Sequence, residues 1–200
     1  MIIESVSKAK KKNLYNVIID KKVYEFNEDI IIEFNLYKGK EIDDELLNKA
    51  LSSNSINDYY NKALNYAARY FKNSCETRQY LIDKGLSNDL SFEIVNKLIE
   101  KGIINDRNII ENNIFSLVKN GNGKLLIIEK LKQKRFDINL INECVNNIDM
   151  EFYFECLNKL YKKVKNKYDK YPDYVRIGKL KSYLYSRGYS SSDISELNIQ

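Results

Sequence analysis

The first 35 residues carry a pattern of apolar and polar positions that differs from the rest of the chain. Two runs rich in β-branched and aromatic residues, 15–20 and 23–26, flank a polar pair and predict a β-hairpin. Because a two-stranded hairpin is marginal alone, we expect it to pack against the apolar residues of 30–34. Asp43 or Asp44 is then placed to cap a helix that follows.

From residue 57 the apolar period becomes helical. Asn73 and Glu76 have the spacing of a capping box for a second helix, which Gly85 would end, and a third helix would end at Gly102. In the first helix the apolar residues recur at i, i+3, i+4 and i+7 and so predict one buried face. That face comprises Tyr60, Ala63, Leu64, Ala67, Ala68 and Phe71.

The same order of cap, apolar stripe and glycine stop returns along the chain. Asp106 is placed to cap a helix that Gly121 ends, and helices over 124–134 and 138–145 follow. The pattern starts once more from Met150. The chain therefore shows three successive groups of three helices.

A recurring leucine sets the period of these groups. Leu81, Leu131 and Leu184 lie 50 and 53 residues apart, each before a basic residue, and an apolar residue follows each segment. A period of this length is typical of stacked units that are each too small to bury their own face, although chance recurrence of Leu and Lys is the alternative. We predict a mainly α, elongated body of three tandem three-helix repeats. The expected divisions are an extension over 1–56 and repeats over 57–104, 105–149 and 150–200.

Three stretches stand out by their order and spacing. They are Ala63-Leu64 with Lys72-Asn73, Glu76-Thr77-Arg78, Tyr80-Leu81 and Lys84-Gly85; Ile104-Asn105-Asp106-Arg107 with Gly123, Ile127, Leu131 and Lys134; and Leu180, Tyr183-Leu184, Arg187-Gly188-Tyr189 and Ile194. These stretches resemble the RecX family, which regulates the RecA recombinase. The resemblance covers residues 57 to 197, and the hairpin looks like the extension of members from low-GC bacteria. It departs from the family pattern at Ile109 and Ile110, where an aromatic-Ala pair is common, and at Arg135, where Gly is expected.

The resemblance implies a function without reaction chemistry. It implies a regulator that lies in the groove of the RecA filament on single-stranded DNA and inhibits RecA in recombination, DNA repair and the SOS response. We expect a monomer, and we expect it in the cytoplasm because the N-terminus lacks a secretory pattern and no apolar stretch is long enough to span a membrane. We also expect no cofactor and no membrane partner. The alternative is a helix-turn-helix-like protein that binds duplex DNA directly.

The residues themselves argue against catalysis. The chain has no His, which removes the usual general base and the commonest metal ligand, and its three Cys lack the CxxC spacing of a zinc site. Residues Gly121 to Lys124 resemble the end of a phosphate-binding loop. That motif needs Gly where this chain has Val118, and Ser or Thr where it has Leu125. We therefore expect no catalytic, metal or cofactor site.

Positive charge is concentrated in the C-terminal half. The formal net charge is only +5, but residues 118–135 hold six basic residues against one acidic, and 157–187 hold ten against two. Six tyrosines interleave with the second group, which could combine phosphate contacts with base stacking; the alternative is a solvated helix face. The candidate residues for binding RecA or DNA are Arg78, Lys124, Lys130, Lys132, Lys134, Arg135, Lys179, Lys181 and Arg187.

Overall fold

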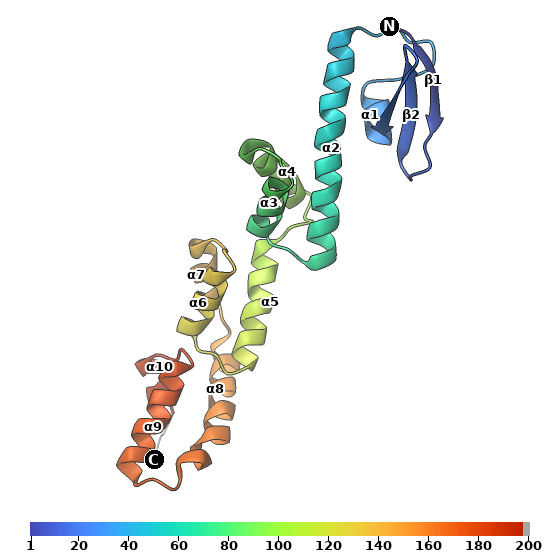
Figure 1. The fold of residues 1–200 in the computed structure, drawn as a ribbon. Coiled ribbons are helices and arrows are strands. Elements are labelled where there is room, and N and C mark those ends of the chain that lie inside the picture. Colours follow the sequence, from blue (N-terminus) through green and yellow to red (C-terminus); the bar gives the residue numbers. More distant parts are fainter. Residues whose placement is uncertain (198–200) are drawn as a thin grey trace. The chain divides into compact units, whose positions relative to one another are not determined.

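The computed structural model describes residues 1–197, which fall into two compact units. The first unit holds residues 1–72 and 77–104, and the second holds 73–76 and the residues from Asn105 onward. The expected mainly α fold is confirmed: the described residues form ten α-helices, one short 3₁₀ helix and one three-stranded sheet (Figure 1).

The N-terminal sheet contains one strand more than the sequence predicts. Its antiparallel strands lie in the order β1-β2-β3. The predicted hairpin corresponds to β2 and β3, and the additional strand β1 pairs with the other edge of β2. Asp20 and Lys21 form the two-residue turn between β2 and β3 with φ of 46° and 64°, as a tight hairpin turn requires. The strands are β1 (Ile3–Lys8), β2 (Leu14–Ile19) and β3 (Lys22–Asn27).

The apolar run after the hairpin packs against the sheet, as predicted, and does so as helix α1 (Glu28–Glu33). Its Ile30 is 2% exposed and belongs to a core that also takes in the start of α2. The other buried members of this core are Ile3, Val17, Ile19, Phe26, Leu36, Ile42, Leu47 and Ala50. The sheet and α1 therefore gain the hydrophobic support that a hairpin lacks alone.

Helix α2 (Asp44–Tyr70) links this core to the rest of the first unit (Figure 1). Asp43 caps it by accepting a hydrogen bond from the Leu46 N–H at 2.7 Å. The helix runs without a break through the expected division at residues 56 and 57, which stays a prediction. Its second half packs with α3 (Ser74–Asp83) and α4 (Asn88–Glu100) around the buried residues Ala63, Ala67, Leu81, Leu86, Ile94, Val95, Leu98 and Ile104.

The second unit contains the helices that the sequence assigns to the second and third repeats. One hydrophobic cluster extends from Ile110 in α5 to Leu197 after α10, so these helices share a single core. Such sharing is the expected result when each group alone has too little apolar surface. The helices are α5 (Asp106–Lys119), α6 (Lys124–Gln133), α7 (Ile138–Asn146), α8 (Met150–Lys165), the 3₁₀ helix η1 (Asn166–Tyr168), α9 (Asp173–Ser186) and α10 (Ser191–Ser195).

The helix caps confirm one prediction and correct another. The capping box is present, because Asn73 Oδ1 accepts from the Glu76 N–H at 2.7 Å and the Asn73 N–H donates to Glu76 at 3.3 Å. The prediction that Asp106 caps α5 is wrong: Asn105 accepts from the Asn108 N–H at 3.0 Å. Asp106 instead accepts hydrogen bonds from the backbone N–H and hydroxyl of Ser74, a partner that local sequence could not indicate.

Two glycines bring the start of α6 against the end of α9. The Gly123 N–H donates to the Arg187 carbonyl at 2.8 Å, and the Leu125 N–H donates to the Gly188 carbonyl at 3.1 Å. A Cβ on Gly123 would lie 2.3 Å from the Gly188 carbonyl carbon, so the two backbones meet only because side chains are absent. The contact also satisfies N–H groups that a helix start leaves without partners.

We expect Gly123→Ala to lower the free energy of unfolding by roughly 2–3 kcal/mol, because the added methyl meets rigid backbone. Gly178→Ala is the control, since Gly178 lies within α9 with open space around it and Ala should stabilise the helix by about 0.5–1 kcal/mol. Urea unfolding followed by circular dichroism at 222 nm measures both. Equal midpoints for the two variants would contradict the role of the glycine contact.

Candidate functional site

Three of the predicted cations on α6 are held by neighbours within the second unit. The Lys124 ammonium lies 5.4 Å from the centre of the Tyr153 ring. Lys130 donates to Asn122 Oδ1 at 2.9 Å, and Lys134 donates to an asparagine side chain of α5 at 2.6 Å. These contacts fix the charges near the protein surface, yet they leave each ammonium with further hydrogens to donate.

The other two cations of this group are more freely exposed. Lys132 and Arg135 lie at the C-terminal end of α6, where positive charge also complements the helix dipole. Arg135 has a φ of 60°, in the left-handed region that favours Gly. The departure from the family pattern at this position therefore places a charged side chain on a backbone conformation that Gly would adopt with less strain.

Helix α9 carries a second pair of exposed cations. Lys179 and Lys181 are both exposed, and the Lys179 ammonium lies 4.6 Å from the centre of the Tyr171 ring. Tyr174, at the start of the same helix, is 80% exposed. Cations and a free aromatic ring thus occur on one element, which is the combination that binds single-stranded nucleic acid elsewhere.

Arg187 has a different environment from the other candidates. Its Nε donates to the Gly121 carbonyl at 3.0 Å, and its Nη2 donates to the Asn120 carbonyl at 2.5 Å. These carbonyls follow the C-terminal end of α5, where helix carbonyls lack partners within the helix. The guanidinium therefore stabilises the fold of the second unit and is not a free surface charge.

Arg78 belongs to the first unit, on α3, apart from the other eight candidates in the sequence. Its guanidinium carbon lies 5.6 Å from the centre of the Phe92 ring, which is 53% exposed. Its Nε is buried and has no hydrogen-bond partner within residues 1–197. Stacking on Phe92 accounts for the side chain's position, and the role of Arg78 in binding stays a prediction.

The buried phenols of the second unit serve packing. The Tyr153 hydroxyl donates to Asp193 Oδ2 at 3.2 Å and accepts from the Lys124 N–H, while Asp193 also completes a capping box with Ser190. Burial raises the pKa of both Tyr153 and Tyr189, so both stay neutral near pH 7. Residues 1–197 contain no group of three or more Cys, Asp and Glu side chains that could hold a metal ion.

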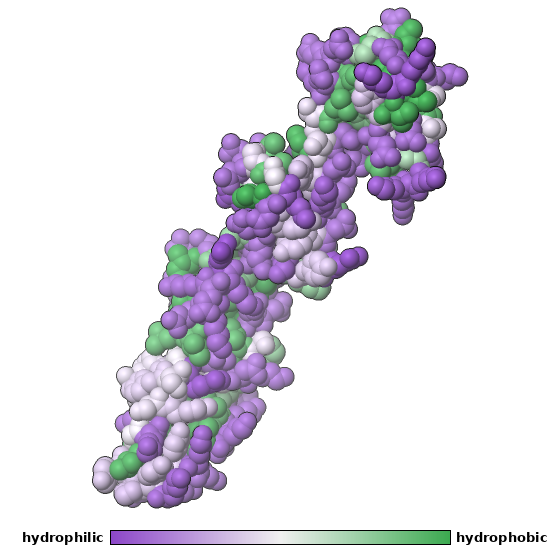
Figure 2. Space-filling view, viewed as in Figure 1, coloured by the Kyte–Doolittle hydropathy of each residue, from purple (hydrophilic) through white to green (hydrophobic). Residues whose placement is uncertain are grey.

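Two features of the surface differ from what the sequence pattern predicts. Phe71 and Ala68 were predicted to lie on the buried face of α2, but both are exposed, and Phe71 is 84% exposed. For Phe71 the reason is that α2 ends at Tyr70 and Phe71 takes the left-handed conformation, with φ of 48°. The lysines between residues 8 and 12 are absent from the predicted binding residues, although their density is visible in the sequence. Hydrophilic residues otherwise dominate the visible surface (Figure 2).

The last three helices match a known family domain. Residues 151–197, which span most of α8 and all of α9 and α10, match the model described as the third three-helix domain of RecX. The regulatory protein RecX of Streptococcus uberis is 29% identical over 94% of this chain and 73% of its own length. That of Streptococcus mutans is also 29% identical, over 90% of this chain and 70% of its own length. The chain is similar to RecX proteins over most of its length.

Solved RecX structures share the fold. A crystal structure of regulatory protein RecX has a TM-score of 0.83 and 22% identity, and covers 97% of both chains. The crystal structure of RecX from Lactobacillus salivarius has a TM-score of 0.67 and 26% identity, and covers 72% of this chain and 94% of that one. The resemblance of the sequence to RecX proteins is therefore confirmed. No helix within residues 1–197 is both long and apolar enough to span a bilayer.

We expect Arg187→Gln to lower the free energy of unfolding by about 1–2 kcal/mol, because it removes charge-assisted hydrogen bonds to two carbonyls. Lys181→Gln removes the same charge from an exposed position and should change stability by less than about 0.5 kcal/mol. Thermal unfolding of the two variants compares them directly. Arg187 would have no structural role if both variants unfolded at the same temperature.

Proposed function

We propose that the chain regulates RecA by binding its filament on single-stranded DNA in the filament groove and inhibiting it. Similarity to RecX proteins carries the proposal, since the curated relatives are named as regulatory proteins. The residues also offer a way to bind: α6 and α9 carry exposed cations, and the backbone contact between Gly123 and Gly188 holds these two helices together. Regulation needs binding only, so it requires no catalytic group.

The exposed cations act as phosphate contacts in this proposal. A lysine ammonium is a compact point charge that binds phosphate without a fixed geometry, which suits a backbone whose sequence varies. Lys132, Arg135 and Lys181 are exposed members of this group. Lys179 keeps its ammonium over the Tyr171 ring, and Lys130 and Lys134 can exchange an asparagine partner for a phosphate. Such contacts make binding sensitive to salt.

Inhibition is expected to weaken when the α9 lysines are removed. Lys179→Ala combined with Lys181→Ala should raise the protein concentration that halves RecA ATP hydrolysis on single-stranded DNA by roughly 5- to 30-fold, equivalent to about 1–2 kcal/mol. Arg187 is left intact, because its loss would disturb the fold. Strand exchange is followed in the same samples.

The control replaces Lys119 and Lys163, two exposed lysines of the same unit outside the candidate residues, by Ala. This control should inhibit like the parent protein. Inhibition unchanged by loss of Lys179 and Lys181 would remove α9 from the interface. Tight binding to duplex DNA without RecA, with a preference for one sequence and no effect on filaments, would favour the direct DNA binder instead.

A further inference from the structure

The loop between β1 and β2 is the most densely basic short segment of the first unit. Lys8 ends β1, and Lys10, Lys11 and Lys12 follow within the loop; all four are exposed. A surface that serves only solubility usually has both charge signs interspersed. Here the three consecutive residues Lys10, Lys11 and Lys12 all carry a positive charge.

The backbone of this loop is fixed to the sheet. The Ala9 N–H donates to the Leu14 carbonyl at 2.9 Å, and the Leu14 N–H donates to the Lys11 carbonyl at 3.4 Å. Asn13 takes the left-handed conformation, with φ of 61°, and its carbonyl accepts from the Glu28 N–H at 2.9 Å. The sheet therefore presents the lysine arms from an ordered base, and less entropy is lost when they bind.

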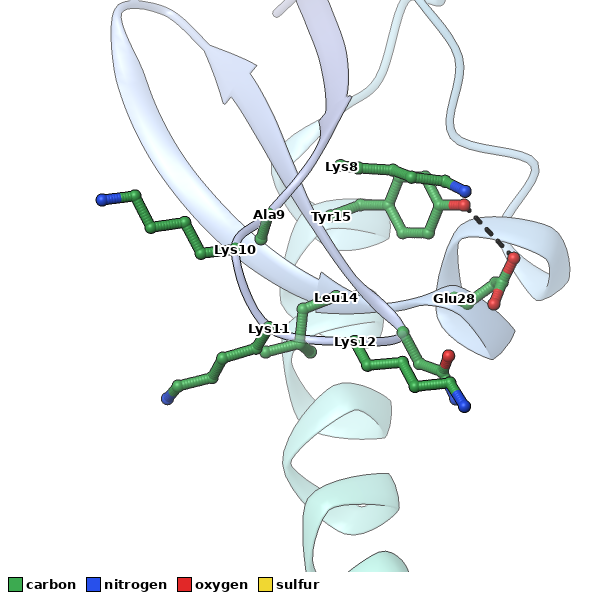
Figure 3. Close-up of a pocket in the computed structure, with 9 residues that line it drawn as sticks. Lys8, Ala9, Lys10, Lys11, Lys12, Leu14, Tyr15 and Glu28 are labelled. Carbon is green, nitrogen blue, oxygen red and sulfur yellow. Dashed lines mark hydrogen bonds between the residues drawn. The ribbon is translucent and has the colours of Figure 1, made fainter.

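The lysines surround an open hollow of about 330 Å³ whose lining consists of residues 8–15 and Glu28. Figure 3 shows Lys10 and Lys11 extending to one side of the loop, while Lys8 and Lys12 extend toward the side of Glu28. Glu28 is the one acid of the lining, and it accepts a hydrogen bond from the Tyr15 hydroxyl at 3.2 Å. None of the four lysines has an ion-pair partner among the described residues.

We propose that the β1–β2 loop is a contact for the phosphodiester backbone of nucleic acid, made by Lys8, Lys10, Lys11 and Lys12. A row of separate point charges on flexible arms suits a ligand with repeated single negative charges. The lining supplies lysine ammonium groups, which bind phosphate as point charges without a fixed geometry, and its one phenol hydroxyl is already engaged with Glu28. The contact is therefore independent of base sequence.

This contact goes beyond the regulation proposed above, because it requires nucleic acid alone and no RecA. It also differs from the α6 and α9 cations, which belong to the other unit. Its strength should depend on salt, since each lysine on a phosphate releases a condensed counterion.

The test replaces Lys10, Lys11 and Lys12 by Ala in the full chain. Binding to a fluorescein-labelled 30-mer of thymidylate is followed by anisotropy between 50 and 200 mM NaCl. Loss of three phosphate contacts should reduce the slope of log affinity against log salt by about 2, and weaken binding at 100 mM NaCl by at least about 10-fold. A labelled duplex of the same length should respond in the same direction.

The matched control replaces Lys21, Lys22 and Lys38, three exposed lysines at the opposite end of the same sheet, by Ala. It changes the net charge equally and should keep the parent slope. Equal slopes and affinities for the two triple variants would overturn the proposal, as would failure of the parent protein to bind either DNA at 50 mM NaCl.

Two further measurements distinguish a nucleic-acid contact from a general anion site and from the regulation of RecA. Vesicles with one quarter phosphatidylglycerol in phosphatidylcholine test for a general anion site, and a loop-dependent loss of vesicle binding without loss of DNA binding would overturn the proposal. RecA ATP hydrolysis is measured on the same samples. A parent protein that binds DNA through the loop but leaves RecA unaffected would support this contact and refute the regulatory function.

Discussion

The second unit depends on the approach of two backbones at Gly123 and Gly188. The Gly123 N–H and the Arg187 carbonyl make one hydrogen bond of this contact, and the Arg187 side chain reaches the two carbonyls that follow α5. One residue thus ties three helices, α5, α6 and α9. Because most of the candidate cations lie on α6 and α9, their relative placement within the unit depends on two positions without side chains and on one arginine.

This arrangement divides the basic residues by what each charge contacts. Arg187 bonds to carbonyls that have lost their helical partners, so its removal leaves polar groups unsatisfied. Lys130 and Lys134 bond to asparagine side chains, which water can replace at little cost. Charge counting along the chain treats these residues alike. Their partners show that one is structural, while the others are available to a ligand.

The sequence predicts those parts of the fold that depend on neighbours along the chain. The Asn73 capping box and the glycine stop at Gly85, whose φ is 93°, are local, and both are present. Strand β1 is not predicted, because its side chains alternate weakly and its stability comes from pairing with β2. The prediction for Asp106 is wrong because its partner, Ser74, is 32 residues away. The structural role of Arg187 likewise depends on distant carbonyls, whereas the lysine loop is visible in the sequence but holds fewer charges than the C-terminal half.

The two basic regions rest on separate hydrophobic cores, and this has a consequence for binding to a polymer. The lysine loop is anchored on the core of Ile3 and Phe26, and the α6 and α9 cations on the core that includes Leu131 and Leu184. A nucleic acid repeats its charge along its whole length, so it offers phosphates to each of the proposed regions separately. If both regions bind nucleic acid as proposed, the second would bind at a high effective concentration once the first is bound, and two weak, salt-sensitive contacts would combine into a stronger one. Separate cores therefore suit a ligand whose binding groups recur, which is the kind of ligand that the charge distribution indicates.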